Sequence, residues 1–151
     1  LSPQTLGIDA SAVRLTVGGP ATGLAGFIAA HQDARTAQRV ALAPAREVAV
    51  TRYDEVTALT LLALDHASAA RFARHTLGPL ADPDQQQLRD TVRVVLTSPD
   101  PADVVAARLG VHKNTVRYRV QQVERMLDRP LQTGAGDLLL AIDYLEAFPN
   151  D

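Results

Sequence analysis

The sequence predicts an α+β fold in which a β-α-β-α lobe over residues 1–80 precedes an all-helical domain over residues 84–151. Two short stretches that alternate apolar and polar residues, 12–18 and 47–52, are typical of strands. The segments between and after them repeat apolar residues every three or four positions, which is typical of amphipathic helices. Pro79 and Pro83 lie between the two regions, and because proline cannot continue a helix, they indicate a boundary.

Five elements are expected in the first region, and their limits follow from turn and capping residues. Gly18-Gly19-Pro20 ends the first strand, Asp54 is a candidate N-cap, and Gly78-Pro79 closes the last helix. In order, the expected elements are a strand at 12–18, a helix from Leu24 to about Leu42, a strand at 47–52, a helix capped by Asp54 and a helix from Ala67 to Leu77.

Four helices are expected in the second region. They are Asp84–Thr97, Asp100–Leu109, about Lys113–Leu127 and Asp137–Phe148. The last carries an apolar stripe from Leu138 to Phe148, which we expect to close a helical core. Oligomerisation through this stripe or through the first region stays open as a second role.

Several function classes lack the residues they need. The chain has no cysteine, which excludes disulfide scaffolds and thiolate zinc sites. Its four histidines show no metal-ligand spacing, and there is no Gly-x-Ser-x-Gly nucleophile elbow and no phosphate-binding Lys-Ser/Thr loop. No apolar run could span a bilayer. We therefore expect no enzyme activity, no cofactor, no metal, no membrane partner and a cytoplasmic location.

Charge is distributed unevenly along the chain. The whole sequence carries a formal net charge of −2, whereas residues 104–129 carry +4 and the remainder −6. A local basic segment on an acidic protein is the electrostatic pattern that a DNA contact requires.

The basic segment overlaps a predicted helix-turn-helix. Asp100 is a candidate N-cap with Pro101 at the first helical position and Asp103 as a capping-box acid. Gly110 is expected in the left-handed conformation that turns the chain, and His112 is expected to cap the next helix. Val116 should then face back toward the small residue Ala106 across the turn.

The helix from Lys113 to Leu127 divides into two faces. Val116, Val120 and Val123 recur at helical spacing and should pack inward. The opposite face carries residue types that can hydrogen-bond base edges, and neighbouring polar residues are better placed for phosphates. The predicted base-reading residues are Lys113, Asn114, Arg117, Tyr118 and Gln121, and the predicted phosphate contacts are Arg108, His112, Thr115, Arg119 and Arg125.

The run Leu109-Gly-Val-His-Lys-Asn-Thr-Val-Arg-Tyr-Arg-Val, with Val123, Glu124 and Leu127 after it, resembles the C-terminal helix-turn-helix of PucR/CdaR-type transcriptional regulators. The helix Leu138–Phe148 resembles the closing helix of that family. Upstream, Gly23-Leu-Ala-Gly-Phe and His75-Thr-Leu-Gly-Pro-Leu resemble its degenerate GGDEF-like domain, of which residues 1–80 would be a part. Cyclase activity is not expected, since Gly18-Gly19 is followed by Pro20-Ala21-Thr22 and by no metal-binding acid.

The resemblance implies a bacterial, cytoplasmic transcription regulator that binds double-stranded DNA as a homodimer or higher homo-oligomer. It also implies an effector-sensing region nearer the N-terminus, which this chain would lack. The alternative is a protein-interaction or oligomerisation module without direct DNA readout. An interaction surface should be more apolar at its centre than the helix start around Arg117, Tyr118 and Arg119, so the residues favour DNA.

Overall fold

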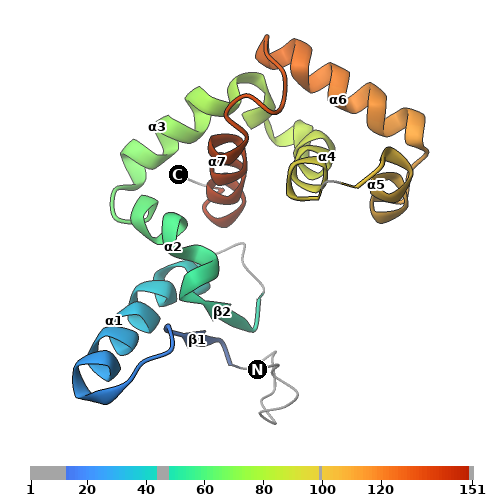
Figure 1. Ribbon diagram of the computed structural model, residues 1–151. Helices are drawn as coiled ribbons and strands as arrows, with labels where there is room; N and C mark the ends of the chain where they lie inside the picture. The colour runs from blue at the N-terminus through green and yellow to red at the C-terminus, as the bar shows by residue number, and fades with distance from the viewer. Residues whose placement is uncertain (1–12, 44–47, 99, 150–151) are drawn as a thin grey trace. The chain divides into compact units, whose positions relative to one another are not determined.

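The computed structural model describes residues 13–43, 48–98 and 100–149, which are mostly helical (Figure 1). The chain divides into two units, Leu1–Ala69 with Glu146–Asp151 and Ala70–Leu145. This division falls inside a helix, upstream of the prolines that suggested a boundary. The assignment of domains to residues 1–80 and 84–151 stays a prediction.

The first unit contains the expected β-α-β-α order. Strand β1 (Leu15–Val17) pairs in parallel with β2 (Val50–Arg52), with Leu15 opposite Val50, and helix α1 (Gly23–Ala41) connects them. Helix α2 (Tyr53–Leu62) follows β2 and packs against α1. Both strands are shorter than predicted, and positions 12 and 47 of the predicted strands lie outside the described residues.

The core of this unit lies on the second half of α1. Ala37 and Val40 are fully buried, and Leu59 of α2 is 4% exposed. Gly18, after β1, lies so close to the Ala30 carbonyl of α1 that a Cβ there would overlap it. A glycine is therefore required where the strand ends against the helix.

The first half of α1 differs from the second half. Leu24, Phe27 and Ile28 follow the predicted helical period, yet their side chains are 76%, 66% and 49% exposed. The ring of Phe27 stacks on that of His31, with centroids 6.3 Å apart. The periodicity thus predicted the helix without showing that the first half of its apolar face is left uncovered.

The predicted cap of α2 was wrong. The helix begins at Tyr53, its N-cap is Arg52, and no side chain caps it. Asp54 lies one residue inside the helix, where it accepts a hydrogen bond from Arg52 Nε at 3.2 Å. The hydrogen bond from Asp54, together with its charge, raises the pKa of the Arg52 guanidinium above its usual value.

The second unit is entirely helical in its described residues. It contains most of α3 (His66–Leu77), the 3-10 turns η2 (Gly78–Ala81) and η3 (Pro83–Gln85), and the helices α4 (Gln86–Thr97), α5 (Ala102–Leu109), α6 (Lys113–Leu127) and α7 (Ala135–Ala147). The predicted helix Asp84–Thr97 thus starts as a 3-10 turn. The predicted last helix, Asp137–Phe148, starts two residues earlier and ends one residue earlier than expected.

Arg89 of α4 holds the proline-containing turns in place. Its side chain is buried, and its guanidinium donates to the Leu80 and Asp82 carbonyls at 2.8 and 2.6 Å and to Gln86 Oε1 at 2.8 Å. Backbone carbonyls, and no carboxylate, therefore satisfy most of this buried cation, although its Nε has no partner. The segment predicted as a linker is folded around this arginine.

Helix α7 carries the stripe predicted to close the core. Leu138 and Ile142 are fully buried, and Phe148, just beyond the helix, is 9% exposed. Asp143 on the same helix pairs with Arg93 of α4 at 2.8 Å. Burial of the stripe within the chain fits the core-closing role better than an exposed oligomerisation surface.

Candidate nucleic-acid interface

The corner between α5 and α6 has the predicted geometry. Gly110 ends α5 with φ +63° and ψ 31°, in the left-handed region. The N–H of Val111 then donates to the Ala106 carbonyl at 3.0 Å and satisfies one of the last acceptors of the helix. A Cβ on Gly110 would meet nothing within 4 Å, so only the backbone conformation demands glycine here.

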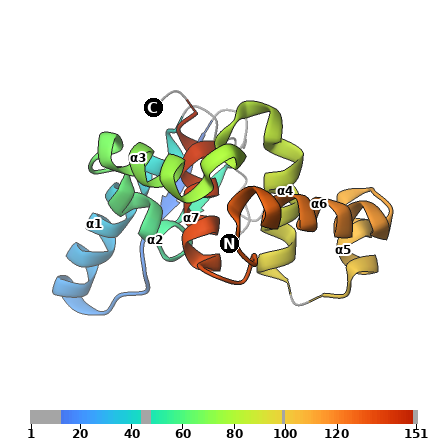
Figure 2. The same cartoon turned by 90° about the horizontal axis from the view of Figure 1, so that it is seen from above.

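A small apolar core holds the two helices at this corner. Val105, Ala106 and Val116 are buried together, which confirms that Val116 faces back toward Ala106. Partly buried side chains surround them, namely Val94, Val95, Leu109, Val111 and Val120. Contacts link α4, α5 and α6 pairwise, and Figure 2 shows the three helices next to one another.

The predicted start of α5 was wrong by one residue. Pro101 is the N-cap, the helix begins at Ala102, and no side chain caps it. Proline has no N–H, so Asp103 cannot complete a capping box. The carboxylate of Asp100 pairs instead with the Arg108 guanidinium, 2.8 Å away near the other end of α5.

The predicted cap of α6 is confirmed. His112 has extended backbone angles, and its Nδ1 accepts a hydrogen bond from the Asn114 N–H at 3.2 Å. A neutral imidazole whose Nδ1 accepts carries its proton on Nε2. The exposed ring can therefore offer an Nε2–H donor to an external acceptor beside the helix start.

All five predicted base-reading residues lie on the exposed face of α6. Lys113, Asn114, Arg117, Tyr118 and Gln121 are each exposed, and Tyr118 is 60% exposed. Their spacing places them on one face over the first turns of the helix. The side chains of Lys113 and Arg117 make no hydrogen bond or ion pair with the described part of the chain.

The predicted phosphate contacts are in a different state, because three of them already bind groups of the protein. Arg108 donates to Ser98 Oγ at 2.6 Å in addition to its pair with Asp100. Arg119 donates to Gln87 Oε1 at 2.6 Å and to Thr91 Oγ1 at 3.3 Å, both on α4. Arg125 donates to the Gln121 carbonyl of its own helix at 3.2 Å. Thr115 is half-buried at the helix start.

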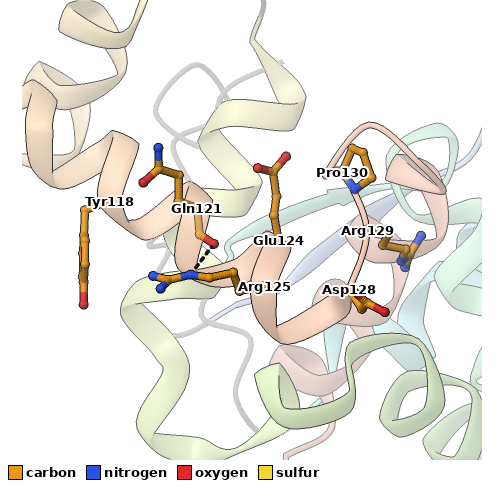
Figure 3. A pocket seen from close by; sticks show the side chains of 7 residues that line it. All are labelled: Tyr118, Gln121, Glu124, Arg125, Asp128, Arg129 and Pro130. Carbon is orange, nitrogen blue, oxygen red and sulfur yellow. Dashed lines mark hydrogen bonds between the residues drawn. The ribbon is translucent and has the colours of Figure 1, made fainter.

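A surface groove of about 770 Å³ continues from the exposed face of α6 (Figure 3). Figure 3 shows Arg125 reaching back along the helix toward Tyr118 and Gln121, with Asp128 and Arg129 beyond the helix end. Glu124 Oε1 accepts from the Leu131 N–H at 3.1 Å, and Arg129 donates to the Thr133 carbonyl. Paired acids and bases thus fill the far end of the groove, which leaves its start as the more basic part.

Sequence reasoning missed the residues that hold the basic side chains. Gln87 and Thr91 anchor Arg119, and Ser98 shares Arg108 with Asp100. Gln87 is separated from Arg119 by 32 residues. No local signal in the sequence marks a pairing over that distance, because it depends on how α4 packs against α6.

Two features of other protein classes were sought in the described residues. No group of three or more His, Cys, Asp or Glu side chains there is arranged to hold a metal ion. None of the helices in the described ranges is both long and apolar enough to cross a membrane.

Comparison with known proteins agrees with this geometry. Residues 88–145 match the family model of the PucR C-terminal helix-turn-helix domain. The match covers α5, the corner, α6 and most of α4 and α7. It points to a DNA-binding transcription regulator. It does not reach the first 80 residues, so their predicted GGDEF-like relationship stays a prediction.

A curated relative was also found in Thermomonospora curvata, described as an uncharacterized protein in the pkwA 5' region. It is 49% identical over 94 residues, which cover 61% of this chain and 51% of the relative. The match thus spans about half the length of that protein. No solved structure matches the chain.

Proposed function

We propose that this chain is the DNA-binding part of a transcription regulator and that α6 enters the major groove of double-stranded DNA. The observation that carries the proposal is the first half of α6. Five exposed polar or aromatic side chains project there from a helix whose opposite face is fixed by Val116 and Val123. A major groove admits an α-helix, and the second helix of a helix-turn-helix is the one that enters it.

The exposed side chains have the chemistry that base recognition needs. Lys113 and Arg117 can donate to guanine O6 and N7, whereas Asn114 and Gln121 can pair with adenine N6 and N7. Lys113 and Arg117 are not engaged elsewhere in the described chain, so neither would give up an internal bond to contact a base. Tyr118 offers its ring to a thymine methyl group and its hydroxyl to a base or phosphate.

Phosphate contacts would set the register of this helix on the duplex. His112 and Thr115 flank its start, and the His112 Nε2–H is a suitable donor to a phosphate oxygen. Arg108, Arg119 and Arg125 would have to share or exchange their present hydrogen bonds to reach phosphates. Their first role in the proposal is to hold α5 and α6 in position.

One helix makes few contacts, so two copies of the chain are proposed to bind together. Two recognition helices on successive half-sites would lie about 34–36 Å apart. A homodimer or higher homo-oligomer, an effector-sensing region elsewhere in the full protein and a partial GGDEF-like domain upstream complete the proposal.

Fluorescence anisotropy tests DNA binding directly. The chain is titrated into a pool of labelled genomic promoter duplexes, beside the variant Lys113→Ala/Arg117→Ala. Wild type should bind, and the double variant should lose about 2–4 kcal/mol of binding free energy at low salt, because two cations leave the interface.

Arg35→Ala is the matched control. Arg35 is an exposed arginine on α1, so its removal changes the net charge without touching α6. It should bind like wild type. If the double variant binds as tightly as Arg35→Ala, or if wild type binds no duplex, the protein-interaction alternative replaces the proposal.

A further inference from the structure

A second recess lies beside the predicted reading face. It is a cavity of about 280 Å³ between α4, α5 and α6. Its apolar wall consists of Val95, Val105, Val116 and Val120 with Ala102, and its polar lining consists of Asp100, Arg117 and Gln121. Binding sites for small molecules are typically concave, mostly apolar and supplied with a few polar groups, at volumes from about 300 Å³ upward.

The polar lining favours an anion. Arg117 is exposed and makes no side-chain hydrogen bond or ion pair with the described residues. The opposing charge of Asp100 is offset, because Arg108 lies 2.8 Å from its carboxylate. Helix α5 begins at Ala102 without a side-chain cap, so its positive end also faces this region.

We infer that this cavity binds a small amphiphilic anion, whose apolar body packs among the valines and whose carboxylate pairs with Arg117. Four valine side chains around one recess offer an apolar surface that water cannot satisfy, and an apolar ligand body can. An aliphatic or aromatic monocarboxylate has this combination of a short apolar body and one charged end.

The location gives the site a regulatory consequence, which rests on the proposed function. Arg117 and Gln121 line the cavity and also belong to the predicted base-reading set. An anion that holds Arg117 would withdraw that side chain from a base. Ligand and DNA would then weaken each other's binding by the same factor, because coupling between two sites is reciprocal.

Methyl and amide NMR of the whole chain, titrated with hexanoate in the absence of DNA, tests the site. Hexanoate should produce saturable shifts at the methyl groups of Val95, Val105, Val116 and Val120. Hexanol, which has the same chain and no charge, should bind about five- to tenfold more weakly, because it lacks the charge-assisted bond to Arg117.

Two pairs of variants separate the site from general effects. Arg117→Ala should weaken hexanoate binding about five- to tenfold, whereas Arg125→Ala on the same helix should not. Ala102→Leu projects into the cavity and should reduce binding severalfold, whereas Ala107→Leu, at an exposed position of α5, should leave it unchanged. Both pairs keep their controls on the same helices, so misfolding would be visible in the spectra.

The inference is overturned if hexanoate causes no saturable shift at these valines. It is equally overturned if hexanol binds as well as hexanoate, or if Arg117→Ala and Ala102→Leu bind hexanoate like wild type. These readouts contain no DNA, so they stand even where the chain fails to bind a duplex. Failure of DNA binding with intact hexanoate binding would refute only the proposed function.

Discussion

Two arginines of α6, two residues apart, are in opposite states. Arg117 is exposed and makes no side-chain bond with the described chain, whereas Arg119 is half-buried and donates to Gln87 and Thr91 of α4. The sequence around them is uniformly basic, and nothing in it distinguishes the two. The neighbouring helix therefore decides which arginine is available to a ligand and which one positions the helix.

The same division holds for the whole basic segment. On the exposed face, Lys113 and Arg117 are available, and the corner at Gly110 fixes how that face is presented. On the flanks, Arg108 and Arg125 are bound to groups of the protein. A net positive charge along a segment thus overstates the number of cations that are ready to meet DNA.

The largest effect should follow from Gly110→Val, which disturbs the presentation of both faces. A β-branched residue at φ +63° should lower the free energy of unfolding of the helical unit by about 2–3 kcal/mol. Gly110→Asn is the control, because asparagine tolerates this conformation and should cost much less. Chemical denaturation measures both variants, and an unchanged midpoint for Gly110→Val would contradict the role given to the corner.

Arg117→Ala sharpens the comparison on the exposed side. It should cost about 1–3 kcal/mol of DNA-binding free energy and relax the preference at one base pair, while protein stability stays near that of wild type. Binding to a set of duplexes that differ at single positions measures this. An equal loss on every duplex would assign Arg117 to a phosphate.

Arg119→Ala tests the bound side. Its two bonds join α6 to α4, so their loss should reduce protein stability by about 1 kcal/mol. Thermal unfolding of Arg119→Ala beside Arg117→Ala reads out the difference between the two positions. If Arg119→Ala keeps full stability and instead lowers the salt dependence of DNA binding, Arg119 is the phosphate contact that the sequence predicted.

The smallest effect should come from Arg125→Ala. Its hydrogen bond runs to the Gln121 carbonyl of its own helix and is exposed to solvent, so stability should change by less than about 0.5 kcal/mol. A stability loss as large as that of Arg119→Ala would show that the boundary between bound and available arginines has been drawn in the wrong place.

The corner could be predicted from sequence because its signals are local. Gly110, His112 and the spacing from Val111 to Val116 act within a few residues, and each was confirmed. The caps of α2 and α5 were misassigned, because an aspartate beside a helix start can pair with an arginine instead of capping. Asp54 does so with Arg52, and Asp100 with Arg108.

Features that depend on packing between distant segments were beyond the reach of the sequence. The partners of Arg119 lie on α4, and the buried Arg89 is satisfied by carbonyls of a turn that read as a linker. The exposed start of α1 is the same kind of case, since periodicity shows that Phe27 and Ile28 share a face and says nothing of whether another element covers it.

The central claim is that the exposed face of α6 meets DNA. The salt dependence of binding tests it most directly, because each cation that neutralises a phosphate charge contributes to the slope of log K against log salt. The account predicts that Lys113→Ala/Arg117→Ala lowers this slope by about 1–2 relative to wild type, while Arg35→Ala leaves it unchanged. A wild-type slope in the double variant would contradict the claim.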